Sequence, residues 1–419
     1  MSRVVVIGQG YVGLPLAVRA AEVGHTVVAL DLDERRIEAL RDGRSYIEDI
    51  TSDDVRDKVA AGRLIPTTSY EDAAGFDVAI IAVPTPLREA TPDLSFISSA
   101  GRSLAPHLTR GATVVLESTT YPGTTEELLL PELERGSGLT AGVDFFLGYS
   151  PERIDPGNKH WRLTNTPKLV SGIDAESLAR VEEFYSDLVE STIATSGTRE
   201  AELAKLLENT FRHVNIALVN EMAIFAHQLG VDIWESIRAA STKPFGFMPF
   251  TPGPGVGGHC LPVDPSFLSW EVKRRLGQTF RFVELANDVN EHMPDYVVQR
   301  LASMLNGRRM AVNGSRILLA GLAYKRNSGD VREAPAHRII ELLHELGATV
   351  MGADPHVDDA LWPAGVERVQ LDEPTIRRAD ACVLVTDHDV FDLSLLQEGL
   401  VDVLDTRDAL RPGDRIERY

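Results

Sequence analysis

The sequence of 419 residues contains only two cysteines, Cys260 and Cys382. A disulfide framework needs more cysteines than this, and neither residue stands in the CxxC or Cys/His spacing that is typical of a zinc site. The apolar strand pattern ACVLVTD around Cys382 favours a core position for that residue. The sequence therefore predicts chemistry that needs no metal ion.

Basic residues are also scarce, because 42 Lys and Arg stand against 62 Asp and Glu and give a formal net charge of −20. Nucleic acids and anionic membranes bind basic faces that neutralise their phosphates. We therefore expect neither as a partner. A small phosphorylated ligand remains compatible, since local amides and a few cations can hold it.

Long hydrophobic runs are missing as well. No segment approaches the roughly 18 apolar residues of a transmembrane helix, and the start MSRVVVIG lacks the basic and apolar regions of a secretory signal. A cytoplasmic enzyme is the expectation. With 43% apolar residues, a chain of 419 residues can form two or three domains with sizeable cores.

Short β-branched runs alternate with helical stretches in the first half of the chain. Apolar runs without polar alternation, which are typical of parallel strands buried on both faces, occur at Val4–Ile7, Thr26–Leu30, Val78–Val83 and Thr113–Leu116. Strands alternating with helices in this way predict a doubly wound parallel sheet.

The pattern then becomes helical, with one long helix from Thr198 to a terminal glycine near Gly230 and a second helical stretch over about 280–305. Strand patterns resume after Ser315 with RILLAG, which resembles the opening RVVVIG but lacks the glycines that follow it. The predicted fold class is α/β, with two Rossmann-like doubly wound domains joined by a central helical domain. The expected domains are 1–195, 196–308 and 309–419.

The first strand leads into the run Gly8-Gln9-Gly10-Tyr11-Val12-Gly13, and the second ends in Asp31, eighteen residues past the third glycine. Glycines permit the tight turn, close approach of a pyrophosphate and close helix packing, while the helix N-terminus faces the phosphates. Asp31 would bind the ribose hydroxyls and repel a 2′-phosphate. The pattern predicts NAD, with NADP as the alternative because Arg36 could accommodate a phosphate.

Ten of the nineteen residues from Pro244 to Pro262 are Gly or Pro, and this loop carries Cys260. A thiolate is a good nucleophile, and neighbouring glycines would allow a substrate carbon to approach it. A flexible linker is the alternative, although linkers are usually rich in Ser, Gly or charge rather than proline and aromatic residues. The spacing alone leaves a catalytic and a structural role for Cys260 open.

Two further groups have chemistry that suits a dehydrogenase. Lys205 and Asn209 are four apart on the long helix and so share a face, where an ammonium and an amide can polarise a carbonyl. Glu152 follows an apolar strand, at the edge where ligands of open sheets gather. A solvated helix surface for the first pair, and simple pairing of Glu152 with Arg153, are the alternatives.

The sequence resembles the UDP-glucose and UDP-N-acetylhexosamine 6-dehydrogenase family over nearly its whole length. The resemblance rests on co-linear motifs: GQGYVGLPLA, VPTP, ESTTYPGTTEE, SPERIDPGN, AELAKLLENTFRHVNIALVNE, PGPGVGGHCLPVDP and GLAYKRNSGDVREAPA. It implies an N-terminal NAD domain, a central dimerisation domain and a C-terminal UDP-binding domain. A homodimer or a higher homo-oligomer is therefore expected.

The resemblance also implies roles for individual residues. Cys260 would form a thiohemiacetal and then a thioester, with Lys205 and Asn209 stabilising the oxyanion. Asp264 would be an acid/base acting with water, Glu152 would serve thioester hydrolysis, and Thr119 would lie near the same water. Expected cofactor contacts are Gly8, Gly10, Tyr11, Val12, Gly13, Asp31, Arg36, Pro84, Thr85, Ser118 and Thr119. Expected substrate contacts are Glu152, Arg153, Lys205, Asn209, Arg212, Gly257, Lys325 and Arg332, and Arg332 is left open between its own site and a partner subunit's.

The expected reaction is the four-electron oxidation of the C6 hydroxyl of a UDP-sugar. UDP-glucose enzymes commonly carry a lysine where this chain has Val263, and Asn-Pro-Glu-Phe where it has Ser150-Pro151-Glu152-Arg153. These departures, with TTYPGTTEE and IDPGN, resemble the N-acetylhexosamine branch of the family. We expect UDP-N-acetylglucosamine as the substrate, then UDP-N-acetylmannosamine, then UDP-glucose. A β-hydroxyacid dehydrogenase, which needs no cysteine, and a non-catalytic nucleotide-sugar sensor are the remoter alternatives.

Overall fold

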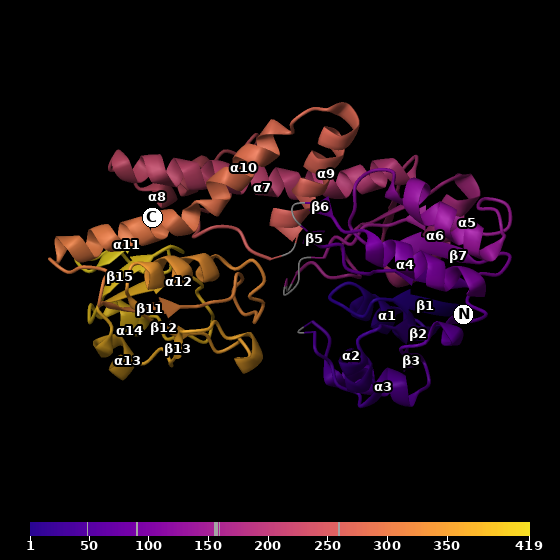
Figure 1. Ribbon diagram of the computed structural model, residues 1–419, viewed down its shortest axis with the longest axis horizontal. Helices are drawn as coiled ribbons and strands as arrows, with labels where there is room; N and C mark the ends of the chain where they lie inside the picture. Colours follow the sequence, from indigo (N-terminus) through magenta and orange to yellow (C-terminus); the bar gives the residue numbers. More distant parts are fainter. Residues whose placement is uncertain (48, 89–90, 155–157, 159, 259) are drawn as a thin grey trace. The chain divides into compact units, whose positions relative to one another are not determined.

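The computed structural model describes residues 1–47, 49–88, 91–154, 158, 160–258 and 260–419, with only the backbone of Cys260. The chain forms two compact units (Figure 1). Unit 1 comprises Met1–Glu208 and Trp270–Leu276, and unit 2 comprises Asn209–Ser269 and Gly277–Tyr419. No helix in the described part of the chain is long and apolar enough to cross a membrane.

Unit 1 is built on an eight-stranded sheet with the order β10-β9-β8-β7-β4-β1-β2-β3. Neighbouring strands are parallel except β8 and β9, which are antiparallel. The strands are β1 (Arg3–Ile7), β2 (Thr26–Leu30), β3 (Leu64–Thr67), β4 (Val78–Ile81), β7 (Thr113–Leu116), β8 (Phe146–Tyr149), β9 (Lys168–Gly172) and β10 (Thr192–Ala194). The strand order reverses between β1 and β4, where open α/β sheets bind ligands.

Helices cover both faces of this sheet because its central strands are apolar on both sides. Val4 and Val6 of β1 enter one core, and Val5 and Ile7 enter the other. The helices of the unit are α1 (Gly13–Glu22), α2 (Glu34–Arg41), α3 (Ser52–Ala60), α4 (Ser95–Leu104), α5 (Leu130–Ser137) and α6 (Ala175–Leu188). The doubly wound sheet predicted from the sequence is confirmed.

Unit 2 contains a second, all-parallel sheet with the order β13-β12-β11-β14-β15-β16. Its strands are β11 (Arg316–Ala320), β12 (Thr349–Ala353), β13 (Glu367–Arg368), β14 (Ala381–Leu384), β15 (Asp402–Asp405) and β16 (Ile416–Arg418), and its helices are α12 (Pro335–Glu345), α13 (Glu373–Arg378) and α14 (Ser394–Gln397). This order repeats that of β3-β2-β1-β4-β7-β8 in the first sheet. The core position predicted for Cys382 is confirmed, because its side chain is fully buried in β14.

Five helices form the region between the two sheets in the sequence: α7 (Thr198–Gln228), α8 (Ile233–Ala240), α9 (Cys260–Leu276), α10 (Arg281–Glu291) and α11 (Met293–Gly307). Helix α7 ends as predicted beside Gly230, whose φ is 69°. Helices α7 and α9 each contribute residues to both units.

Two predicted elements differ from the structure. The helical stretch expected over 280–305 is two helices, because Pro294 in the first turn of α11 cannot continue the ladder of α10. The loop expected to continue to Pro262 ends earlier, since α9 begins at Cys260 and tolerates a proline in its first turn. The predicted nucleophile is thus the first residue of a helix.

Candidate functional site

The glycine-rich turn after β1 has the geometry of a phosphate cradle. Gly8 has a φ of 93°, and a methyl group there would lie 2.5 Å from the carbonyl oxygen of Ala82. A methyl group at Gly13 would collide with the Gly8 carbonyl, whereas Gly10 has no atom within 4 Å of that position. The first and third glycines are therefore needed for packing, and the second leaves open space beside the α1 N-terminus. The residues fit a dinucleotide pyrophosphate.

Asp31 lies at the carboxyl end of β2, as predicted. Its carboxylate accepts the Gln9 N–H at 2.7 Å and the Asp33 N–H at 2.9 Å, and it pairs with Arg36 at 3.1 Å. Asp31 therefore joins the glycine turn to the loop after β2. The arrangement positions one carboxylate beside the turn, and it places the Arg36 guanidinium next to that carboxylate.

The other expected cofactor residues lie near the same turn or beyond the carboxyl ends of β4 and β7. Tyr11 is exposed within the turn, and Val12 precedes the first residue of α1 without a side-chain cap. Thr85 and Ser118 are buried, and the Ser118 hydroxyl donates to the Val83 carbonyl at 2.7 Å. Pro84 and Thr119 are adjacent to these residues in the chain. Carboxyl ends of parallel strands share one edge, so the set collects at that edge.

Glu152 follows β8 and lies in a buried cluster of charges. Its carboxylate contacts the Lys168 ammonium at 3.1 Å, and Lys168 contacts Glu117 at 2.6 Å. The Tyr185 hydroxyl donates to Glu117 at 2.8 Å. Burial opposes the ionised form of Glu152, but the charges of Lys168 and Lys205 hold its pKa below the usual value. Burial raises the pKa of Glu117.

Arg153 is not the ionic partner of Glu152. Its guanidinium pairs with Glu208 at 2.7 Å and donates to the Pro167 carbonyl at 2.7 Å, although its backbone N–H donates to Glu152 at 2.6 Å. The alternative interpretation, an ion pair between Glu152 and Arg153, is therefore wrong.

Lys205 and Asn209 lie one turn apart on α7, and both are buried, with exposed fractions of 8% and 5%. A solvated helix surface, the alternative for this pair, is therefore wrong. Asn209 donates from its amide nitrogen to Asp264 on α9 at 2.6 Å. Arg212, one turn of α7 away from Asn209, is exposed.

The glycine loop before Cys260 packs against residues Tyr324–Glu333 of unit 2. A methyl group at Gly257 would overlap the Tyr324 side chain, and one at Gly258 would lie 2.7 Å from the same ring. The Gly258 N–H donates to the Arg332 carbonyl at 2.9 Å. The structure thus brings the cysteine loop to the segment that carries Lys325 and Arg332. His259 lies outside the described residues.

Lys325 is half-buried in this segment, and the Arg332 guanidinium is paired with Asp330 at 2.6 Å. Earlier in the glycine loop, the Gly253 N–H donates to the buried Asn220 of α7 at 2.9 Å. The Arg407 guanidinium also lies against Gly253. Asn220 and Arg407 were not identified from the sequence.

The second sheet differs from the first at its equivalent of Asp31. Asp354, at the end of β12, accepts the N–H groups of Leu322 and Ala323 and contacts His388 at 2.9 Å. Its side chain is fully buried. Burial opposes ionisation, but these donors lower the pKa of Asp354 to about 2. The Asp354 carboxylate is thus enclosed by protein donors, which agrees with the expectation of a different ligand for this sheet.

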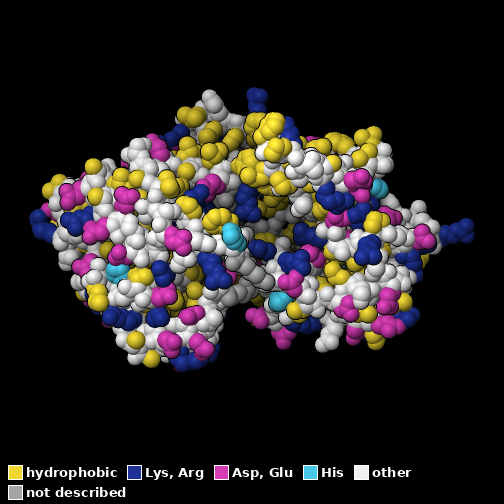
Figure 2. All heavy atoms as spheres, turned by 180° about the vertical axis from the view of Figure 1, so that it is seen from behind, with side chains coloured by type: hydrophobic (Ala, Val, Ile, Leu, Met, Phe, Trp, Pro, Cys, Tyr) yellow, Lys and Arg dark blue, Asp and Glu magenta, His cyan; other side chains and the backbone are white. Residues whose placement is uncertain are grey.

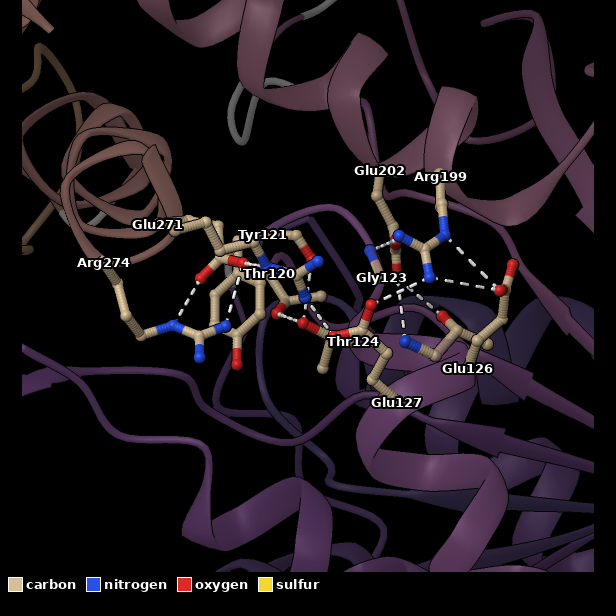
Figure 3. A network of polar contacts seen from close by, with 12 residues as sticks. Thr120, Tyr121, Gly123, Thr124, Glu126, Glu127, Arg199, Glu202, Glu271 and Arg274 are labelled. Atoms are coloured by element: carbon tan, nitrogen blue, oxygen red, sulfur yellow. Dashed lines mark hydrogen bonds and ion pairs between the residues drawn. The ribbon is translucent and has the colours of Figure 1, made fainter. Parts of the chain in front are cut away.

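Figure 3 shows Arg199 and Glu202 of helix α7 in contact with the segment that runs from Thr120 to Glu127. The Glu202 carboxylate accepts the Gly123 N–H at 2.5 Å, and the Thr125 N–H and hydroxyl at 2.9 and 2.7 Å. Burial raises the pKa of Glu202 to about 7, although these donors oppose the shift. Glu202 therefore ties the loop of Thr119 to the helix of Lys205.

Glu117, Lys168 and Glu202 are further residues that the sequence reasoning missed. Glu117 directly follows β7 and Lys168 begins β9. A charged residue directly beside a buried apolar strand was the available signal. Within the described part of the chain, no group of three or more His, Cys, Asp or Glu side chains is arranged to hold a metal ion.

Three family models match successive parts of the chain. They are the NAD binding domain of the UDP-glucose/GDP-mannose dehydrogenase family over residues 2–189, its central domain over 199–292 and its UDP binding domain over 318–412. The chain belongs to this family. It is an NAD-dependent oxidoreductase, as the glycine turn and Asp31 predicted.

The family members most similar to this chain include two with different sugar names. A UDP-N-acetyl-D-glucosamine 6-dehydrogenase of Pseudomonas aeruginosa is 39% identical over 93% of this chain and 91% of its own length. A UDP-N-acetyl-D-mannosamine dehydrogenase of Pyrococcus horikoshii is 37% identical over 93% and 90%. A solved structure of a UDP-D-ManNAc dehydrogenase from P. horikoshii superposes with a TM-score of 0.89 at 33% identity, covering 100% of this chain and 98% of that one.

Proposed function

We propose that this protein oxidises the C6 hydroxyl of a UDP-N-acetylhexosamine, with UDP-N-acetylglucosamine foremost, to the carboxylate. The observation that carries the proposal is the buried contact of Asn209 with Asp264 at 2.6 Å. Residues four apart on a helix share a face. The contact therefore links the Lys205–Asn209 face of α7 to the face of α9 on which Asp264 follows Cys260 by one turn.

The overall change removes two hydrides from one carbon. One alcohol, two NAD⁺ and one water give a carboxylate, two NADH and three protons. The nicotinamide, when bound beside the glycine turn, supplies the hydride acceptor for both oxidations. Each remaining step falls to the side chains of the protein.

Lys205 and Asn209 polarise the C6 oxygen as the alcohol becomes an aldehyde, because an ammonium and an amide stabilise developing negative charge in a buried site. The Cys260 thiolate then adds to the aldehyde carbon and forms the C–S bond of a thiohemiacetal. A helix N-terminus favours negative charge, and Cys260 is the first residue of α9. Loss of the second hydride leaves a thioester.

Water completes the reaction by adding to the thioester carbon, and the C–S bond breaks to release the carboxylate and the thiolate. We assign hydrolysis of the thioester to Glu152, which accepts a proton of this water, with Thr119 near the same water and Asp264 as a second acid/base that acts with it. Glu152 is suited to this role because Lys168 keeps it ionised in a buried position. Lys325, Arg212, Gly257 and Arg332 are assigned to the substrate.

The choice of sugar rests on Val263 and on Ser150–Arg153, which depart from the UDP-glucose pattern, and on the similarity to a UDP-N-acetyl-D-glucosamine 6-dehydrogenase. The relative and the structure from P. horikoshii favour UDP-N-acetylmannosamine as the second candidate. NADH absorbance with UDP-N-acetylglucosamine, UDP-N-acetylmannosamine and UDP-glucose at equal concentrations tests the assignment. We expect the highest kcat/KM with UDP-N-acetylglucosamine, and no NADH from any of the three would contradict the proposal.

We also propose that two copies of the chain associate through helix α7. Large apolar side chains stay exposed along it at helical spacing: Leu203, Leu207, Phe211, Leu218, Met222 and Phe225, with Leu229 directly after its end. Phe282 and Leu285 of α10 are exposed as well. Figure 2 shows hydrophobic side chains gathered along its upper border, where Figure 1 draws α7 and α10. An apolar stripe of this length is typical of a protein interface.

Sedimentation velocity tests the association. We expect a dimer for the unmodified protein and a shift toward monomer for Leu218→Asp, which places a charge in the stripe. Leu361→Asp is the matched control, because Leu361 is an equally exposed leucine outside α7. A monomer for the unmodified protein would contradict the proposal.

A further inference from the structure

Three charged side chains, one of them the predicted hydrolytic residue Glu152, meet at the carboxyl edge of the first sheet. Glu117 follows β7 and Glu152 follows β8, which are parallel neighbours. Lys168 is the first residue of β9, and β9 is antiparallel to β8. The start of β9 therefore lies at the same edge as the ends of β7 and β8.

The contacts between these side chains form one continuous chain. The Lys168 ammonium lies 3.1 Å from Glu152 and 2.6 Å from Glu117, and 5.2 Å from the centre of the Tyr185 ring. The Lys168 side chain is 3% exposed and that of Glu117 is 0% exposed. Within the described residues, the second carboxylate oxygen of Glu117 has no hydrogen-bond partner.

Glu152 is also surrounded by Lys205 and by two backbone N–H groups. Lys205 of α7 is near enough to lower its pKa. The backbone N–H groups of Arg153 and Ile154 donate to its other oxygen at 2.6 Å each. The Tyr185 hydroxyl of α6 donates to Glu117. The Arg153 guanidinium forms its ion pair with Glu208 and not with Glu152. In the described part of the chain, Lys168 is thus the only cation that forms an ion pair with Glu152.

Glu117 allows Glu152 to take up a proton without leaving the Lys168 ammonium unpaired. With both carboxylates ionised, the three side chains carry a net charge of −1. When Glu152 takes a proton, the remaining Glu117–Lys168 pair is neutral. Without Glu117, the same uptake would leave an unpaired buried ammonium, which is costly.

We propose that Lys168 is the positioning residue that orients Glu152 for thioester hydrolysis, and that Glu117 is the counter-charge that lets Glu152 accept the proton of the attacking water. In this step the water oxygen forms a bond to the thioester carbon and one of its protons passes to Glu152, the C–S bond breaks to release the Cys260 thiolate, and Lys168 stays paired with Glu117. The inference rests on the proposed function, because it assigns a partner to the hydrolytic residue named there.

Two variants should shift the pH dependence of hydrolysis in opposite directions. Glu117→Gln removes the counter-charge, so Glu152 should hold its proton less well and the acid limb of kcat should move down by about one pH unit. Lys168→Met leaves two carboxylates without their cation, so the acid limb should move up by about one unit. Lys168→Arg should restore most of the original profile.

The burst of NADH before the steady state reports the oxidation steps separately from hydrolysis of the thioester. Both variants should keep the rapid burst of NADH, because within the described residues the ion pairs of Glu117 and Lys168 do not involve Lys205 or Asn209. Glu117→Gln should also accumulate thioester that is detectable by intact mass. Lys58→Met, which removes a lysine from α3, is the control and should leave burst and profile unchanged. Shifts in the same direction, or no shift, would overturn the inference.

A measurement without substrate covers the case in which Lys168→Met folds poorly or the proposed function itself fails. The carboxyl carbon of Glu152 in protein labelled with ¹³C-glutamate can be titrated by NMR and assigned by its loss in Glu152→Gln. We expect the midpoint to fall in Glu117→Gln. An unmoved midpoint overturns the role of Glu117 even if uronic acid is formed, whereas absent UDP-sugar oxidation with a moved midpoint contradicts only the proposed function.

Discussion

Asp31 and Asp354 occupy equivalent positions in the two sheets but have different surroundings. Each follows the second strand of its sheet and accepts backbone N–H groups from the turn after the first strand. Asp354 is enclosed by His388, whereas Asp31 lies beside a glycine turn with open space at Gly10. The first sheet therefore suits a dinucleotide and the second does not.

Asp31→Ala tests the ribose contact. Losing a charged hydrogen-bond acceptor costs about 1.5–3 kcal/mol, so we expect the KM for NAD to rise roughly tenfold or more and discrimination against NADP to relax. Steady-state kinetics with both cofactors measure this. Asp57→Ala, on the exposed side of α3, is the control. Unchanged NAD kinetics would show that Asp31 does not bind the ribose.

Cys260→Ser tests the nucleophile. A serine hydroxyl is almost entirely protonated at neutral pH, whereas a thiol is partly ionised, so attack on the aldehyde should slow greatly. We expect uronic acid formation to fall well beyond tenfold, since each ~1.4 kcal/mol of barrier is a factor of ten. Glu152→Gln should fail differently, with a burst of NADH and a thioester visible by intact mass.

The control for this experiment is Cys382→Ala, which removes the other, buried thiol. Activity per folded molecule should persist in that variant. A rate for Cys260→Ser within about tenfold of the unmodified protein would rule out an essential nucleophile.

At the scale of elements, the strands and the long helix could be predicted because their signals are local. Continuous apolar runs gave β1, β2 and β7 within a residue, and Gly230 marked the end of α7. The break at Pro294 and the helical start at Cys260 were missed, because proline is tolerated in a first helical turn. Glu117 and Lys168 were missed because their burial depends on a tertiary partner, which periodicity does not reveal.

Helix α7 positions several site residues, and Glu202 ties it to the Thr119 loop. Its raised pKa, about 7 against an ordinary 4.5, means that stability is fully present below pH 4.5 and is lost as pH rises through 7. Relative to Glu202→Gln, the free energy of unfolding of the unmodified protein should fall by about 2–3 kcal/mol from pH 5 to pH 8.

Urea unfolding of both proteins at pH 5 and pH 8 measures this difference. Glu200→Gln is the control, because Glu200 is exposed on the first turn of the same helix. A difference between Glu202→Gln and the unmodified protein that stays constant with pH would contradict the assignment.

In the whole molecule, a sheet with the same Rossmann-like strand order occurs once in each half of the sequence. The loop that carries Cys260 lies between the two sheets in the chain. This explains why one chain can be expected to bind both a dinucleotide and a nucleotide-sugar. In the proposed mechanism the reaction depends on a covalent intermediate, which keeps the aldehyde bound until the second oxidation.

The stoichiometry of NADH to product distinguishes a captured aldehyde from a released one. Complete conversion of a limiting UDP-N-acetylhexosamine should yield two NADH per uronic acid, with no free aldehyde in the presence of an aldehyde-trapping hydrazine. The product should differ from the substrate by the gain of one oxygen and the loss of two hydrogens at C6. One NADH per sugar, with an aldehyde recovered as its hydrazone, would contradict the account.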